Sequence, residues 1–284
     1  MAVRPADLAG SWYPANEADC RRSIESFIEE SMPCPSSKGG GIGGIVPHAG
    51  WVFSGRIACN VISCLQREPA PDTCVIFGRH LHSGSGNYIM KEGMWSTPLG
   101  DLEIDNELCE ALDSEFSFNL ETATRYDQDN TIELQLPFVK YFFPEAKLAP
   151  IGVPPRAESL MIGERVAELC KGMGRRAVIL GSTDLTHYGS NYGYAPKGAG
   201  QEAVDWVKNE NDKAVVDLMV SMDPQGVIED AMDKQNACCA GAAAAAIVAA
   251  KGLGAGQGER LVYATSYDVR PDSSFVGYAG VLFY

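Results

Sequence analysis

Short apolar runs alternate with longer stretches of mixed polarity along most of the chain. Runs bounded by glycine, proline or polar residues predict buried strands, and apolar residues at helical spacing predict helices between them. We expect strands at 44–46, 74–77, 148–153, 177–180, 261–265 and 277–283. We expect helices at 17–32 with Asn16 as the N-cap, 56–67, 106–114, 131–143, 159–172, between 199 and 232, and at 237–251.

The order of these elements predicts the fold class. Alternating strands and helices favour an α/β sheet that is covered on both faces. Residues 88–105 are expected to be extended or to form a hairpin with a turn at 98–100, and the last two strands can pair antiparallel. No internal repeat, low-complexity linker or clear boundary interrupts the pattern. We therefore expect one domain over residues 1–284.

Composition and charge exclude some classes of partner. The net charge is −14, which argues against nucleic acid because the phosphate backbone is bound by clustered Lys and Arg. No apolar stretch reaches the roughly 18 residues that span a bilayer, and the N-terminus lacks the apolar core of a secretory signal. We expect a soluble, cytoplasmic protein with no membrane partner.

The nine cysteines include no CxxC pair, which leaves a zinc ribbon or a thioredoxin-type motif unsupported. Most are expected to be small buried residues of helices or strands, which fits a reducing compartment. The cysteines in question are Cys59, Cys64, Cys74, Cys109 and Cys170.

All four histidines of the chain follow predicted strands. Ligands of open α/β sheets bind beyond the carboxyl ends of the strands, so parallel strands would bring these residues to one rim. Neutral imidazole is a common ligand of zinc, iron and copper. A single histidine at a strand end is more often a structural residue than a metal ligand. Four histidines at strand ends make a metal site about as well supported as a purely structural role. The residues that follow the four strands are His48; His80 and His82; Asp184 and His187; and Asp268.

Cysteine is the candidate for a further ligand. With Asn236 as the N-cap of the alanine-rich helix, Cys239 would lie in the first turn, where the positive helix end favours a thiolate. We expect Cys238 to be a small core residue, whereas the role of Cys239 stays open on helix position alone. Asp184 suits a second role, because an aspartate beside His187 can fix the tautomer of the imidazole and raise its basicity.

Several motifs distributed over the whole chain together resemble the Memo-like family. The likeness includes the prokaryotic members of the family in the AmmeMemoRadiSam system, which are often encoded near, or fused to, an AMMECR1-like domain and a radical SAM protein. The motifs are GSWYP (10–14), PHAGWVFSG (47–55), WSTPLGDLEID (95–105), NTIELQLPF (130–138), STDLTHYG (182–189), NACCAG (236–241) and VGYAG (276–280).

The resemblance implies a three-layer α/β/α sandwich like that of class III extradiol dioxygenases (LigB-like), which open catechol-type rings with non-haem Fe(II) and O₂. It implies that His48, His82 and Cys239 are the metal ligands. It also implies that His187, with Asp184, stands at the place of the acid–base histidine.

The chain departs from the family pattern at three places. The family usually has two adjacent histidines where this chain has His80-Leu81-His82, so the choice of His82 rests on alignment. Asn130 replaces a histidine, and Phe53 stands where some members have tyrosine. We expect a site with fewer acid–base groups than in its relatives.

Two functions fit these residues. The first is a non-haem-metal-dependent, dioxygenase-like oxidoreductase that acts on a small molecule, with Fe(II) the favoured divalent metal. The second is a metal- or peptide-binding module without turnover, working with AMMECR1-like and radical SAM partners. Because a thiolate ligand is soft and oxidisable, copper or zinc are the alternatives to iron.

Overall fold

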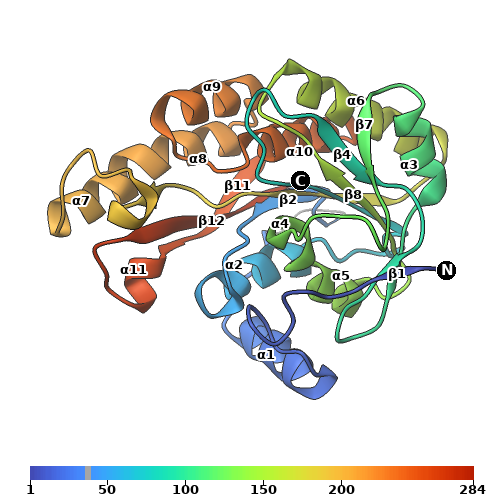
Figure 1. The fold of residues 1–284 in the computed structure, drawn as a ribbon, viewed down its shortest axis with the longest axis horizontal. Coiled ribbons are helices and arrows are strands. Elements are labelled where there is room, and N and C mark those ends of the chain that lie inside the picture. Colours follow the sequence, from blue (N-terminus) through green and yellow to red (C-terminus); the bar gives the residue numbers. More distant parts are fainter. Residues whose placement is uncertain (36–39) are drawn as a thin grey trace.

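The computed structural model describes residues 1–35 and 40–284, in which a mixed sheet lies between two groups of helices (Figure 1). One face carries α2 (Trp51–Ser63), with α1 (Glu17–Glu29) and α5 (Leu136–Phe142) outside it. The other face carries α10 (Ala240–Gly252), with α6 (Ala157–Gly172) and α9 (Pro224–Lys234) against it. The predicted α/β class and its three layers are confirmed.

Nine strands form the main sheet, in the order β10-β12-β2-β9-β3-β8-β4-β7, with β11 paired to β12. The central strands β2, β9, β3 and β8 are parallel, whereas β12 runs antiparallel to β2 and to β11. A second small sheet has the order β1-β5-β6. The bounds are β1 (Val3–Arg4), β2 (Gly43–Val46), β3 (Thr73–Gly78), β4 (Asn87–Met90), β5 (Met94–Trp95), β6 (Leu102–Glu103), β7 (Phe118–Glu121), β8 (Lys147–Gly152), β9 (Ala177–Ser182), β10 (His187–Tyr188), β11 (Gly258–Thr265) and β12 (Phe275–Phe283).

The alanine-rich helix α10 lies in the interior, where it packs against the sheet and α6. Nearly all of its residues are buried, because small side chains let neighbouring backbones approach closely. A Cβ atom built on Gly163 of α6 would lie 2.4 Å from the Ala245 carbonyl oxygen. At the start of α10, a Cβ atom built on Gly241 would lie 2.3 Å from the Pro154 carbonyl oxygen, so close packing also positions the end of the helix that follows Cys238 and Cys239.

The helix α2 begins at Trp51, five residues before the predicted start at 56. Gly50 is its N-cap, and the Trp51 ring stacks on Phe138 of α5 with 4.3 Å between ring centroids. The predicted helix 131–143 is two helices, α4 (Asn130–Glu133) and α5, with Pro137 in the first turn of α5. Asn16 caps α1 as predicted, since its side chain accepts from the Asp19 N–H.

The other helices follow the predicted regions. Residues 199–232 hold α7, a π-helical turn (Val207–Asn211), α8 and most of α9. Several short elements of the described residues lie where no element was predicted, namely β1, β7, β10, a 3-10 turn (Ser190–Tyr192) and α11. The helices not yet given are α3 (Asn106–Asp113), α7 (Gln201–Trp206), α8 (Asp212–Val220) and α11 (Ser266–Val269).

One disulfide joins Cys34, after α1, to Cys64, at the end of α2. Cys64 is buried as predicted, but it is bonded to Cys34 rather than being only a small core residue. The other four named in that prediction, Cys59, Cys74, Cys109 and Cys170, are free and buried. Because one pair is oxidised, cysteine usage no longer argues for a reducing compartment.

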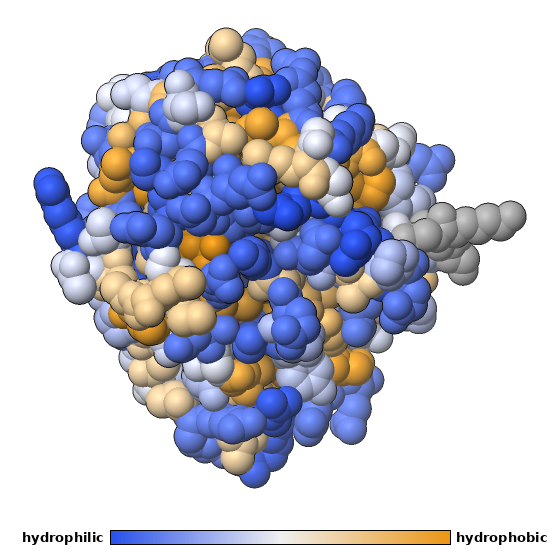
Figure 2. Space-filling model, turned by 90° about the vertical axis from the view of Figure 1, so that its right-hand side faces the viewer, coloured by the Kyte–Doolittle hydropathy of each residue, from blue (hydrophilic) through white to orange (hydrophobic). Residues whose placement is uncertain are grey.

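On the face drawn in Figure 2, hydrophobic residues form small groups between hydrophilic ones. None of the helices in residues 1–35 and 40–284 is long and apolar enough to cross a membrane.

Candidate metal centre

The carboxyl ends of three parallel strands build the candidate site. His48 follows β2 by two residues, and His80 follows β3 by two residues. Between these strands lies β9, whose last residue is Ser182 and whose continuation carries Asp184. The predicted convergence at this rim therefore holds for these residues.

Two imidazoles and two thiols lie together at this rim. The ligand atoms of His48, His80, Cys238 and Cys239 all lie within 4.8 Å of one another. Cys238 Sγ is 3.3 Å from His48 Nε2, Cys239 Sγ is 3.6 Å from His80 Nδ1, and the two sulfurs are 3.7 Å apart. His48 and Cys239 are buried, Cys238 is half-buried, and His80 is the most exposed member.

These separations suit a single ion. A tetrahedral ion with sulfur at about 2.3 Å and nitrogen at about 2.0–2.1 Å has sulfur–sulfur edges of roughly 3.8 Å and sulfur–nitrogen edges of roughly 3.5 Å. Three contacts of the group lie within a few tenths of an ångström of these edges, whereas the separations over the whole group extend to 4.8 Å. The donor set therefore fits a metal ion in chemical type, and binding would draw the four atoms closer together.

The tautomer of His48 follows from its neighbours. Ser182 Oγ donates to the Thr131 carbonyl oxygen over 2.6 Å, so its own hydrogen is already used. The same oxygen lies 3.0 Å from His48 Nδ1 and must accept from it. His48 thus holds a proton on Nδ1 and presents Nε2, the atom that can lose a proton, to Cys238.

The tautomer of His80 follows in the same way. Asn130 Nδ2 donates to the His48 carbonyl oxygen over 3.0 Å, which fixes the amide so that Oδ1 faces His80. His80 Nε2 lies 3.2 Å from that oxygen and donates to it. His80 Nδ1 is therefore left with a lone pair directed at Cys239.

Charges in the group are arranged around His48. Burial lowers the pKa of its imidazole, but the charges of Asp184 and Cys238 outweigh burial and raise this pKa to about 9. Burial raises the pKa of the Cys238 thiol, yet the hydrogen bond with Cys239 and the charge of His48 bring it well below its ordinary value. Burial and the contact with Cys238 raise the pKa of Cys239. These shifts favour the thiolate of Cys238 and the protonated form of His48, and a metal ion bound here would displace the proton from His48 Nε2.

The cysteines stand just before α10 rather than inside it. Cys239 is the N-cap of this helix, and Asn236, the predicted N-cap, is buried with Nδ2 bonded to the Asn211 carbonyl and to Asp230. The Cys238 N–H donates to the Asp184 carbonyl, and the Cys239 N–H donates to Thr183 Oγ1. These bonds fasten the cysteine turn to the loop after β9.

His82 lies outside the group that the described residues form. It is exposed, and its Nδ1 accepts from the Gly84 N–H over 3.1 Å. The chain turns at Arg79, whose φ of 72° is in the left-handed region, and His80 rather than His82 then faces the thiols. The role of His82 as a ligand stays a prediction.

Asp184 contacts His48 rather than orienting His187. Its Oδ1 accepts from the His48 N–H over 2.7 Å, and its Oδ2 is 3.9 Å from His48 Nε2. His187 Nδ1 donates to the Leu185 carbonyl over 3.1 Å, which leaves Nε2 as the basic nitrogen. Tyr192 packs edge-on against this ring, with 5.0 Å between centroids.

The other aspartate of the predicted rim has a local role. Asp268 accepts from the Thr265 N–H and hydroxyl as a capping box of α11, and it pairs with Lys208. These contacts give the Asp268 carboxylate a structural role that needs no bound ligand.

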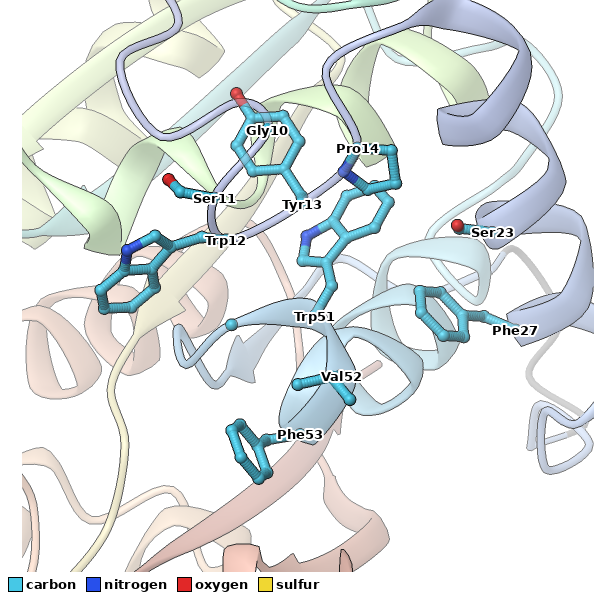
Figure 3. Close-up of a pocket in the computed structure, with 11 residues that line it drawn as sticks. Gly10, Ser11, Trp12, Tyr13, Pro14, Ser23, Phe27, Trp51, Val52 and Phe53 are labelled. Atoms are coloured by element: carbon cyan, nitrogen blue, oxygen red, sulfur yellow. The ribbon is translucent and has the colours of Figure 1, made fainter.

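A cavity of about 630 Å³ opens beside the start of α2 (Figure 3). Its aromatic lining includes Trp12, Trp51 and Phe53. None of the four metal-site residues lines it.

Sequence reasoning did not assign a role at this site to four residues, His80, Cys238, Ser182 and Asn130. His80 and Cys238 were considered and set aside, although each stands next to or near the chosen ligand in sequence. Ser182 and Asn130 act on the histidines through hydrogen bonds that only the folded chain brings together.

Comparison with known proteins agrees with the motifs. Residues 4–282 match the family described as Memo-like protein. A MEMO1 family protein of Methanopyrus kandleri is 34% identical over 100% of this chain and 99% of its own length. A second one, from Pyrococcus abyssi, is 32% identical over 99% of both chains. An uncharacterized protein from Escherichia coli K12 has 12% identity and a TM-score of 0.48, covering 75% of this chain and 86% of its own.

Proposed function

Since this chain belongs to the Memo-like family, we propose that it is a metal-binding protein that holds one ion between His48, His80, Cys238 and Cys239. The observation that carries the proposal is the close spacing of two imidazole nitrogens and two sulfurs, all within 4.8 Å of one another. Two hydrogen-bond chains support it, a buried one through Ser182 and a more exposed one through Asn130.

The donor set favours a soft metal. Two sulfurs and two imidazole nitrogens in a tetrahedral arrangement are typical of zinc, and thiolates also select copper(I). Fe(II), the metal favoured by the dioxygenase resemblance, is usually held by two histidines and a carboxylate. We therefore propose zinc or copper as the native metal ahead of iron.

Four protein donors leave no open position, which favours a module that holds metal without turnover. Partners would then supply the chemistry, and AMMECR1-like and radical SAM proteins are the partners that the family resemblance suggests. The cytoplasmic location stays a prediction.

Metal analysis tests this proposal. Protein purified under reducing conditions and without oxygen should contain about one equivalent of metal, and His48→Ala should contain little. His82→Ala is the matched control, because this exposed histidine lies outside the group and should leave metal content unchanged. Full metal content in His48→Ala would contradict the proposed site.

A dioxygenase-like oxidoreductase is the second candidate, supported by the free Nε2 of His187. A bound metal would lower the pKa of a substrate hydroxyl. His187 Nε2 would then accept the proton, and the half-buried Cys238 is the donor whose departure would open a position. Oxygen uptake with a catechol-like compound, lost in His187→Ala while metal is retained, would favour this candidate over the module.

A further inference from the structure

Cys238 and Cys239 are neighbours in sequence whose sulfurs also face each other. Side chains at i and i+1 diverge on a helix and point to opposite sides of a strand. The 3.7 Å between these sulfurs therefore depends on the turn before α10, where Cys239 has φ −129° and ψ 53°. We infer that this pair is a redox-active dithiol that hydrogen peroxide converts reversibly into a disulfide between adjacent residues.

The surroundings of the pair suit this reaction. Cys238 is half-buried, whereas the other free cysteines among the described residues are buried. The Asp184 N–H points at Cys238 Sγ over 3.3 Å, and Thr183 Oγ1 lies 3.7 Å from the same sulfur. Cys238 is thus the more accessible of the two cysteines, and the Cys239 sulfur lies 3.7 Å away, close enough to resolve the oxidised product.

The reaction balances with peroxide as the only co-reactant. The Cys238 sulfur attacks one peroxide oxygen, forms a sulfenic acid and releases water. The Cys239 sulfur then attacks the Cys238 sulfur, the sulfur–sulfur bond forms, and the second water leaves. Two thiols lose two protons and two electrons, and one peroxide becomes two waters.

The product should be easy to reduce. Consecutive Cα atoms are about 3.8 Å apart, below the range of about 4.4–6.8 Å that disulfides usually span. Such strained and accessible disulfides are the labile ones, so a dithiol reductant should reopen this bond. A sulfur in a disulfide is no longer a thiolate ligand, so oxidation would also remove two of four donors. Only this last consequence rests on the proposed metal function.

A single tryptic peptide reports on the pair. Cleavage after Lys234 and Lys251 gives the peptide 235–251, which contains Cys238 and Cys239 and no other cysteine. The full chain is reduced, freed of metal with a chelator, treated with one equivalent of hydrogen peroxide, alkylated and digested. The peptide should appear two hydrogens lighter and unalkylated, and prior treatment with dithiothreitol should restore two alkyl groups. A peptide that keeps both alkyl groups after peroxide would overturn the inference.

Two variants sharpen the test. Cys238→Ser should leave a peptide that never loses the two hydrogens, whereas Cys170→Ala, which removes a buried cysteine of α6, should react as the wild type does. A sulfinic acid in wild-type protein instead of the disulfide would also overturn the inference, because it means that Cys239 does not resolve the sulfenic acid.

Metal release separates this inference from the proposed function. Zinc-loaded protein treated with peroxide should release its metal to a chromogenic chelator and regain affinity after dithiothreitol. Disulfide formation in protein that never binds metal would support the dithiol and refute the metal site. Protein that binds metal stoichiometrically but whose peptide 235–251 does not react with peroxide would support the metal site and refute the dithiol.

Discussion

Ser182 accepts a hydrogen bond from His48 Nδ1 over 3.0 Å while its own hydrogen goes to the Thr131 carbonyl. The direction of these two hydrogen bonds decides which nitrogen of His48 faces Cys238. A strand-end serine thus acts on the candidate metal centre without touching the ion.

Replacing this serine should weaken metal binding. Ser182→Ala removes the acceptor of the Nδ1 proton, and loss of such a partner typically costs about 10–100-fold in metal affinity. Competition with a chelator of known affinity measures the loss. Ser159→Ala is the control, since Ser159 is also buried and bonds a backbone carbonyl, but on α6. Equal affinities in the two variants would mean that Ser182 does not orient His48.

Asn130 should act on His80 in the same way. Asn130→Ala removes both its acceptor for His80 and its donor to the His48 carbonyl, and we expect weaker metal binding. Asn130→Asp keeps an acceptor for His80 but cannot donate, so its affinity should lie between those of the wild type and Asn130→Ala. If both variants bind metal as the wild type does, His80 is not held through this amide.

The strand-end rule located the site from sequence, but it could not choose the ligands. Which histidine faces the thiols depends on the backbone of Arg79, which is in the left-handed region. This conformation is uncommon for residues other than glycine, and no sequence pattern predicts it for an arginine. That conformation is held by ion pairs of Arg79 with Glu121 and Asp127. These partners lie more than 40 positions away, so the sequence offers no local signal for the turn.

Cys239, the predicted ligand, lies in the group, and Cys238, which was expected to be a core residue, lies there as well. The alanine-rich helix was predicted, but its N-cap is Cys239 rather than Asn236, because Asn236 is bonded to Asn211 and Asp230. The helix begins three residues later than predicted, and this difference decides whether the Cys238 side chain lies in the core or in the site. Long periodic elements were predicted well, whereas β7 and β10 are short strands whose pairing comes from β4 and β12.

The buried Asp212 should make stability depend on pH. Burial raises the pKa of its carboxyl from 3.8 to about 7, although it accepts from Thr186 and Tyr263. The folded protein therefore keeps a proton that the unfolded chain loses near 3.8, and the free energy of unfolding falls as pH rises from about 4 to 7. Asp212→Asn, which cannot ionise, should remove up to roughly 4 kcal/mol of this fall.

Urea unfolding at pH 4 and pH 8 measures the effect. Asp212→Asn should gain stability over the wild type at pH 8 and little at pH 4. The exposed Asp205, replaced by Asn, is the control and should change neither. A wild-type pH dependence that persists in Asp212→Asn would refute the role of this carboxyl.

The contact between α6 and α10 should tolerate no added methyl. Gly163→Ala places a Cβ 2.4 Å from the Ala245 carbonyl oxygen, and we expect a loss of about 1–3 kcal/mol in the free energy of unfolding. Gly172→Ala, at the end of the same helix, meets nothing within 4 Å and should be neutral or slightly stabilising. Chemical denaturation measures the stability of both variants. Equal free energies of unfolding would contradict the packing argument.

X-ray absorption at the metal edge tests the central claim most directly. The donor group predicts two sulfur neighbours at about 2.3 Å and two nitrogen neighbours at about 2.0–2.1 Å in the zinc-loaded protein. His80→Ala should lose one nitrogen neighbour, and His82→Ala should give the wild-type spectrum. A first shell without sulfur, or one that changes in His82→Ala and not in His80→Ala, would contradict the site described here.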